Sequence, residues 1–200
     1  MGTFGPDELV ECYRRGIFPM ADSRDASSIF LLDPENRAVF PLDTFQPSRS
    51  MQKFRRKTTL RTSINEDFPQ VIWSCAELRH DTWISVPIEM LYTALHERGE
   101  AHSVEVWDGD RLVGGLYGVT QGGAFFGESM FSTVSNASKL ALIVLVERLR
   151  DRGFTLLDAQ FMTDHLASMG AIEISRADYR ARLAEALDVE AEFGDPPQEL

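Results

Sequence analysis

The sequence predicts an α+β fold built around a central mixed sheet. The chain has 200 residues, of which 44% are hydrophobic and 10% aromatic, and this suits one or two folded domains with a real core. After residue 60, two helical patterns precede three strand patterns that are joined by short turns containing glycine, and a long helix, a strand, a helix and a strand follow. Helices separated from an antiparallel run of strands are typical of this class.

The first 60 residues show weaker patterns. Residues 7–16 are expected to form a short helix that ends at Gly16. Residues 17–50 are rich in Pro, Asp and Ser and are expected to be irregular, with short strands near 29–32 and 38–40.

A change in pattern divides the chain into regions. Clear periodicity begins near residue 60, which predicts a small N-terminal domain over 1–60 and a larger domain over 61–187. Six acids and no base follow from Glu185 onward, so residues 188–200 are expected to form an acidic tail that frays.

Two helices are expected at the start of the larger domain. Phe68, Val71, Ile72 and Cys75 recur at i, i+3, i+4 and i+7, as on one face of an amphipathic helix. A second helix is expected after Ser85, a capping residue, with Pro87 in its first turn. Its predicted inward face is the following set: Met90, Leu91, Ala94 and Leu95.

The next part of the chain predicts a sheet. Residues 101–107 alternate in polarity, and Asp108-Gly109-Asp110 is typical of a hairpin turn. Gly114-Gly115 interrupts the second strand and predicts a bulge or a close approach of a ligand to the backbone. The remaining expected elements are strands over 112–119, 124–127, 155–159 and 171–174, and helices over 137–150 (capped by Ser135 or Asn136), 164–169 and 177–187.

The charge balance is acidic overall but uneven. A net charge of -11 argues against nucleic-acid binding by the whole surface, because phosphate repels it. Six bases nevertheless fall within one stretch that contains no acid: Arg49, Lys53, Arg55, Arg56, Lys57 and Arg61. This stretch is either a solvated face or a patch that contacts phosphates.

Three polar residues lie beside apolar strand patterns and are candidates for chemistry. Glu128 and Asp158 are carboxylates in apolar surroundings, where a charge is costly unless it is paired. Each is either a satisfied structural acid or a group that serves substrate binding or proton transfer. Gln160 lies two residues after Asp158, so on an extended strand both side chains would point the same way and hold a substrate amine.

Other residue types limit the alternatives. An aromatic and Met set could line an apolar pocket or form plain core: Trp83, Phe125, Phe126, Met130 and Phe131. The four histidines show no ligand spacing, so no metal is expected. Two cysteines without a motif, no signal peptide and no apolar run long enough to span a bilayer predict a cytoplasmic protein.

Several motifs together resemble one enzyme family. Tyr13-Arg14-Arg15-Gly16-Ile17-Phe18-Pro19-Met20 is similar to the YxxGIFP signature of the leucyl/phenylalanyl-tRNA–protein transferases. Further matches follow in family order: 47–51, 81–84, 101–107, 112–119, 126–132, 136–139, 157–160 and 165–171. The chain departs from the common pattern in an abbreviated N-terminal domain, in Met20 where many members have Trp, in 30–34 where many have a Trp pair, and in Ala159 where many have Cys.

The resemblance implies a small N-terminal domain followed by an acetyltransferase-like domain of the GNAT type. It implies transfer of Leu or Phe, with Met as a further aminoacyl group, from tRNA to the N-terminal Arg or Lys of acceptor proteins, which marks them for N-end-rule degradation. The basic stretch is then tRNA-binding, and the protein works as a cytoplasmic monomer without cofactor. The residues expected to bind the aminoacyl group are Trp83, Leu116, Phe125, Ser129, Met130 and Met20.

The implied reaction gives roles to the candidate residues. Asp158, beside Gln160, either draws off the proton of the attacking amine or only positions that amine while the tRNA ribose takes the proton. Glu128 is expected to face a cation, either the acceptor side chain or the ammonium of the aminoacyl group. The ester on tRNA is already activated, so neither ATP nor a metal is required.

Two functions of other classes remain as alternatives. An acyl-CoA-dependent N-acetyltransferase is disfavoured because Ser132–Ser138, ahead of the long helix, contains no glycine to cradle a pyrophosphate. A non-catalytic module that binds protein N-termini would need acids but no basic stretch.

Overall fold

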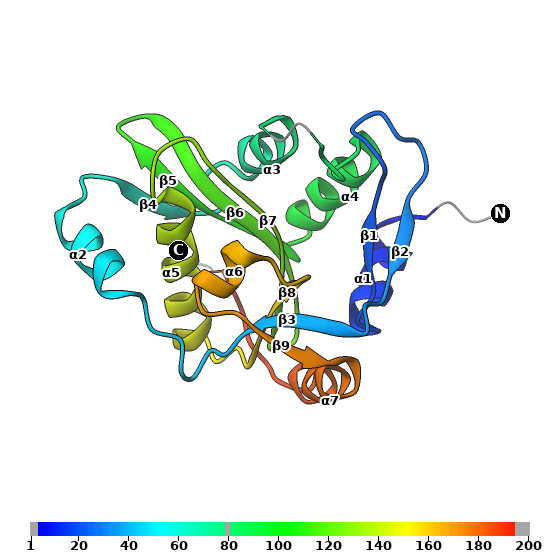
Figure 1. The fold of residues 1–200 in the computed structure, drawn as a ribbon. Coiled ribbons are helices and arrows are strands. Elements are labelled where there is room, and N and C mark those ends of the chain that lie inside the picture. Colours follow the sequence, from blue (N-terminus) through cyan, green and yellow to red (C-terminus); the bar gives the residue numbers. More distant parts are fainter. Residues whose placement is uncertain (1–3, 79–80, 195–200) are drawn as a thin grey trace, which may run out of the picture.

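The computed structural model describes residues 4–78 and 81–194 (Figure 1). Its centre is a seven-stranded sheet in the order β4-β5-β6-β7-β8-β3-β9, in which β7 and β8 pair in parallel and the other neighbours pair antiparallel. The predicted α+β fold with a central mixed sheet is therefore confirmed.

The helices are α1 (Pro6–Arg14), α2 (Arg49–Lys57), α3 (Phe68–Glu77), α4 (Val86–Glu97), α5 (Ala137–Asp151), α6 (Asp164–Ser168) and α7 (Arg176–Leu187). The strands are β1 (Phe18–Met20), β2 (Phe30–Leu32), β3 (Asn36–Phe40), β4 (Arg61–Ile64), β5 (Ala101–Asp108), β6 (Arg111–Gln121), β7 (Ala124–Ser132), β8 (Leu156–Gln160) and β9 (Ile172–Ser175).

The N-terminal part combines α1 with a two-stranded sheet of β1 and β2, on the right of Figure 1. The chain then enters the large sheet, where β3 lies between β8 and β9. Residues 36–40 thus belong to the same sheet as the strands after residue 60, and the division of the chain at residue 60 stays a prediction.

Sequence patterns missed α2, β1 and β4. In α2 the hydroxyl of Ser48 caps the helix by accepting a hydrogen bond from the Met51 amide at 3.3 Å. Met51 is the one residue of this helix that is buried. Phe54, three positions after Met51, is partly buried against the same core. Only these two apolar residues mark the inward face, and the basic residues around them were the visible feature of the sequence.

One core lies on the face of the sheet covered by α1, α3, α4 and α7. The face predicted for α3 is confirmed, because all four of its apolar residues are buried. The face predicted for α4 was wrong at Met90, which is 67% exposed, while Ile88, Tyr92 and Leu95 are buried. The sequence gives no reason to place Tyr92 inside, because tyrosine has a polar hydroxyl as well as an apolar ring. In the structure both are buried, and the hydroxyl donates to Glu128.

A second core fills the opposite face, where α5 lies across the sheet. Asn136 precedes the helix, as one of the two expected caps. A Cβ at Gly114 would stand 2.5 Å from the Cβ of Ala137. Of the two predicted alternatives the bulge is present, because the register of β5 and β6 shifts between Val106, opposite Gly114, and Trp107, opposite Leu112. The close approach to Gly114 is made by α5.

The end of the chain packs on this second core. Phe193 is 2% exposed, and its ring stacks on His102 with centroids 4.5 Å apart. The Arg148 Nε atom donates to the carbonyl of Phe193 at 2.7 Å. The expected fraying was therefore wrong as far as residue 194, because one aromatic side chain among the acids anchors the segment. Residues 195–200 lie outside the described residues.

Within residues 4–78 and 81–194, every helix is too short or too polar to cross a lipid bilayer.

Candidate active site

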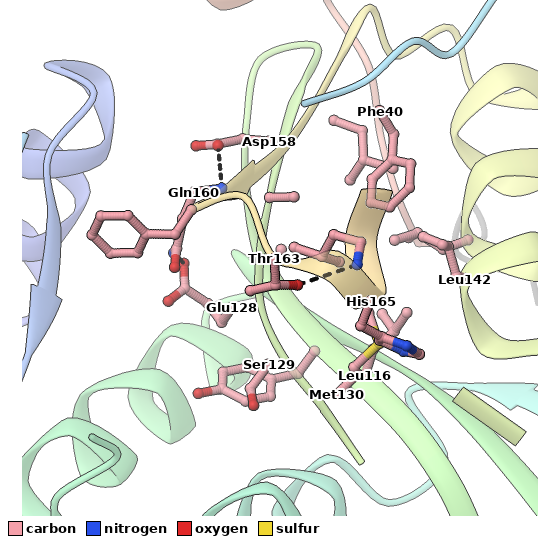
Figure 2. A pocket seen from close by; sticks show the side chains of 17 residues that line it. Phe40, Leu116, Glu128, Ser129, Met130, Leu142, Asp158, Gln160, Thr163 and His165 are labelled. Carbon is pink, nitrogen blue, oxygen red and sulfur yellow. Dashed lines mark hydrogen bonds between the residues drawn. The ribbon is translucent and has the colours of Figure 1, made fainter. Parts of the chain in front are cut away.

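A cavity forms where β7 and β8 separate. Their parallel pairing runs from Ala124 opposite Leu156 to Phe126 opposite Asp158, while β7 continues along β6 as far as Gly114 opposite Ser132. The resulting cavity of about 420 Å³ has polar groups on one side and apolar side chains on the other (Figure 2).

Glu128 forms the polar end of the cavity, and within residues 4–78 and 81–194 no cationic side chain forms an ion pair with it. Its carboxylate accepts hydrogen bonds from the hydroxyls of Tyr13 and Tyr92, each at 2.7 Å, and from the Gln160 amide Nε2 at 2.8 Å. Burial raises the pKa of Glu128 to about 7, and the three hydrogen bonds act in the opposite direction. This carboxyl therefore changes charge near neutral pH, and a cation beside it would favour the anion.

Asp158, in contrast, is fully occupied by partners. Its oxygens accept hydrogen bonds from the Arg37 guanidinium, at 2.9 Å from Nε and 2.6 Å from Nη2, and from the Tyr179 hydroxyl at 2.8 Å. A fourth bond of 2.8 Å comes from the backbone N–H of Gln160. The side chains of Arg37 and Asp158 are 1% and 0% exposed, so this is a buried ion pair with satisfied lone pairs.

Arg37 is a site residue that sequence reasoning missed. Its guanidinium lies between the rings of Phe18 and Tyr179, 4.6 and 4.3 Å from their centroids, and donates to the carbonyl of Gly16 at 2.9 Å. Burial works to lower the pKa of Arg37, but the Asp158 carboxylate outweighs it and raises that pKa above its ordinary value. The available signal was one arginine directly before a short apolar run, residues 38–40.

The pairing predicted between Asp158 and Gln160 takes a different form. Gln160 has a φ of 63°, in the left-handed region, so the strand is no longer extended at this residue. Its side chain turns to Glu128, while only its backbone N–H reaches Asp158. The carboxylate–amide pair at the cavity is therefore Glu128 with Gln160, and Asp158 holds the backbone conformation of Gln160.

The apolar side of the cavity contains part of the predicted set. Leu116, Ser129 and Met130 line it, together with Leu142 and Leu157 (Figure 2). The Ser129 hydroxyl oxygen is buried and has no hydrogen-bond partner in the described part of the chain. A buried hydroxyl without a partner is costly, and a polar ligand group in the cavity would satisfy it.

Three predicted binding residues lie elsewhere. Phe125 is fully buried in the core beneath α5 and does not line the cavity. Met20 and Trp83 pack against the other core and lie close together, because the amide N–H of Ala21 donates to the Trp83 carbonyl at 3.2 Å. The binding roles of these three side chains stay predictions.

The basic stretch divides into paired and unpaired side chains. Arg55 forms an ion pair with Glu147 of α5. Arg61 pairs with Glu66 and lies over the Trp107 ring, 5.1 Å from its centroid. Within residues 4–78 and 81–194, no carboxylate pairs with the four remaining bases: Arg49, Lys53, Arg56 and Lys57.

The described parts of the chain contain no group of three or more His, Cys, Asp or Glu side chains that could hold a metal ion.

Known proteins resemble the chain over its full length. A family model for leucyl/phenylalanyl-tRNA protein transferase matches residues 39–184, and a model for the N-terminal domain of these transferases matches residues 2–35. The transferase of Maricaulis maris is 54% identical over 100% of this chain and 94% of its own length. That of Cereibacter sphaeroides is 56% identical over 96% of this chain and 89% of its own.

Solved structures show the type of fold. FemX matches 84% of this chain and 66% of its own, with a TM-score of 0.55 and 12% identity. The ribosomal-protein-alanine N-acetyltransferase from Brucella melitensis matches 56% of this chain and 87% of its own, with a TM-score of 0.40 and 13% identity. At 12% identity the likeness to FemX concerns the fold alone, and the acetyltransferase type expected from the sequence stays a prediction.

The buried ion pair should be essential to stability. Arg37→Met and Asp158→Asn should each lower the free energy of unfolding by about 3–5 kcal/mol, because each leaves an unmatched buried polar or charged partner. The double variant Arg37→Met/Asp158→Leu should be less destabilised than the sum of its single changes. Urea unfolding measures all of these. Losses below about 1 kcal/mol in the single variants would contradict the role of the pair.

Proposed function

Because the chain belongs to the leucyl/phenylalanyl-tRNA protein transferase family, we propose that the cavity between β7 and β8 holds the aminoacyl group that it transfers. The chain is an aminoacyltransferase that moves Leu or Phe from aminoacyl-tRNA to protein N-termini. The proposal rests on one observation: an apolar cavity ends at a buried carboxylate–amide pair with no cation beside it.

The apolar side of the cavity suits a Leu or Phe side chain. Leu116 and Met130 flank it, and both are flexible or branched apolar residues that fit aliphatic and aromatic groups alike. Glu128 and Ser129 directly precede Met130 on β7, so an aminoacyl group whose side chain contacts Met130 brings its own ammonium toward Glu128. We therefore assign the ammonium of the aminoacyl group to Glu128, with the Ser129 hydroxyl as a further polar contact.

The transfer forms one bond and breaks one. The neutral acceptor amine attacks the ester carbonyl, the new C–N bond forms, and the C–O bond to the tRNA ribose breaks. The amine proton finally resides on the ribose oxygen that leaves. Asp158 already accepts four hydrogen bonds, so we assign it a positioning role and leave the proton to the ribose.

Gln160 is the residue that we place against the acceptor amine. Its Nε2 donates to Glu128, and this leaves Oε1 to accept a hydrogen bond from the N–H of the attacking amine. The left-handed backbone at this residue, held by Asp158, sets where that oxygen points. Its catalytic contribution is then the orientation of the nucleophile.

The finer specificity is also part of the proposal. We propose N-terminal Arg or Lys as the acceptor, since an acidic protein with a net charge of -11 attracts a basic N-terminus. The product would carry a hydrophobic N-terminal residue and be marked for N-end-rule degradation. We place the reaction in the cytoplasm, where charged tRNA is available, and assign it to a single chain.

The acceptor assignment can be measured directly. Labelled Leu or Phe should pass from charged tRNA to a peptide that begins with Arg or Lys, and not to the same peptide beginning with Ala or with acetylated Arg. The acetylated peptide keeps the cationic side chain but lacks the nucleophile, so it separates binding from reaction. Equal transfer to the Arg and Ala peptides would contradict the proposed acceptor.

The ionisation of Glu128 should control binding of the aminoacyl group. An amide analogue of aminoacyl-adenosine keeps its ammonium charged below pH 7, so its affinity should fall about tenfold per pH unit as Glu128 is protonated. The Glu128→Gln variant should bind the analogue weakly, and its affinity should not change with pH over this range. Tyr13→Phe removes a hydrogen bond that favours the carboxylate, so the loss of affinity should begin at a higher pH. If the affinity of the Glu128→Gln variant fell with pH in the same way as that of the wild-type chain, the pH dependence would belong to another group.

The unpaired bases of α2 should bind tRNA phosphates. Changing Lys53, Arg56 and Lys57 together to Ala should weaken binding of charged tRNA and reduce its salt-dependence exponent by about 2–3, while aminoacyl-adenosine turnover is largely kept. Arg61→Ala is the matched control, since this arginine is engaged with Glu66 and Trp107 and should matter less. Equal losses with both aminoacyl donors would show that α2 serves the fold instead.

A further inference from the structure

Three hollows that share lining residues lie in series from the active-site cavity to the basic helix α2, and we call this series the groove. Leu142 of α5 lines the cavity and also a second hollow of about 230 Å³ between α2, α5 and α6. Pro47, Met51 and Ile143 line this second hollow and also a third one of about 430 Å³, which Arg56 borders. The three hollows therefore succeed one another across α5, and we call the middle one the α5 hollow.

The α5 hollow combines apolar walls with one cation. Met51 and Met169 contribute flexible apolar side chains from opposite sides, and Pro47 a rigid one. Lys139, in the first turn of α5, contributes a half-buried ammonium that has no carboxylate partner in residues 4–78 and 81–194. A half-buried ammonium beside an apolar hollow suits a ligand with a flat apolar part and an anionic part.

The distribution of lysines supports an anionic ligand. The chain contains only three lysines: Lys53 and Lys57 lie on α2, and Lys139 lies at the hollow. On a protein with a net charge of -11, one of these cations therefore lies at the hollow and the other two lie on the helix that borders it. A basic acceptor N-terminus would be repelled by these cations, whereas a nucleic-acid backbone would be attracted.

We propose that the α5 hollow binds the nucleotide that precedes the aminoacylated 3′ adenosine of tRNA, with Lys139 contacting its phosphate and the apolar walls contacting its base. This inference rests on the proposed function, because it takes the aminoacyl group to lie in the cavity. The geometry accounts for how an unpaired 3′ end bridges the cavity and the bases of α2. Apolar and stacking contacts to a base together with a cation at the phosphate are the usual means of holding single-stranded nucleic acid.

Three aminoacyl donors of increasing length separate the parts of the groove. Phenylalanyl-adenosine occupies only the cavity, phenylalanyl-cytidylyl-adenosine adds one nucleotide and one phosphate, and phenylalanyl-tRNA adds the rest. For the wild-type chain we expect kcat/KM to rise about tenfold or more from the first to the second donor, the size of one charge-assisted contact. Lys139→Ala should remove most of this gain, and Lys139→Arg should retain it.

Two further variants keep the test independent of stability and general charge. Ala167→Phe fills the α5 hollow from the exposed end of α6 without changing charge, and it should also remove the gain from the second donor. Arg182→Ala removes one exposed charge from α7, far along the chain from the groove, and should leave the gain intact. Melting temperatures of all variants confirm that each is folded.

The possible outcomes distinguish a failure of the nucleotide site from a failure of the proposed function on which it rests. No transfer from phenylalanyl-adenosine by the wild-type chain would count against the proposed cavity itself. Normal transfer with no gain from the cytidylyl group, or a gain that survives in Lys139→Ala and Ala167→Phe, would overturn the nucleotide site alone. A rise in the KM of the acceptor peptide in Lys139→Ala, equal for all three donors, would assign the hollow to the acceptor protein and likewise overturn it.

Discussion

The buried ion pair between Arg37 and Asp158 is the constraint on which the site depends. Removing two opposite charges from water costs several kcal/mol each, and this is offset only when geometry and hydrogen bonding are complete. Here the cost is met by contacts to three separate segments: the Gly16 carbonyl before β1, the Tyr179 hydroxyl of α7 and the Gln160 amide at the end of β8. The charges therefore tie the N-terminal segment to the large sheet, and they set the backbone of a residue that lines the cavity.

Glu128 shows the opposite solution to the same problem. It is as deeply placed as Asp158 but accepts hydrogen bonds only from neutral groups, and burial raises its pKa to about 7. Two carboxylates joined through Gln160 thus have different tasks. Asp158 is neutralised by the ion pair with Arg37, whereas Glu128 has only neutral hydrogen-bond donors around it and would be stabilised as an anion by a nearby cation. Glu128 lines the cavity, so we expect the ligand to supply the cation that the protein does not place there.

Sequence reasoning located elements whose signals are local. The alternation in β5 located the strand, although both of its faces are buried. The periodicity of α3 predicted its buried face, because it depends on neighbours in the same element. Sequence reasoning failed where the decisive partner is distant. Arg37 is separated from Asp158 by 121 positions, and Phe193 packs on His102 across half of the chain. The candidate carboxylates could be found from their apolar context, but which one is paired depends on the approach of β3 to β8, and no local pattern encodes that.

Charge distribution links the site to its large substrate. An acidic protein repels tRNA over most of its surface, so we expect the unpaired bases of α2 to orient the tRNA more than to supply affinity. Pairing sharpens this effect. Arg55 forms an exposed ion pair with Glu147 of α5, while Lys53, Arg56 and Lys57 have no carboxylate partner within residues 4–78 and 81–194. Met51, which is buried in the core beneath α5, sets where the helix lies. For a reaction that needs only the alignment of an activated ester with an amine, we expect a tRNA body fixed relative to Gln160 to contribute directly to catalysis.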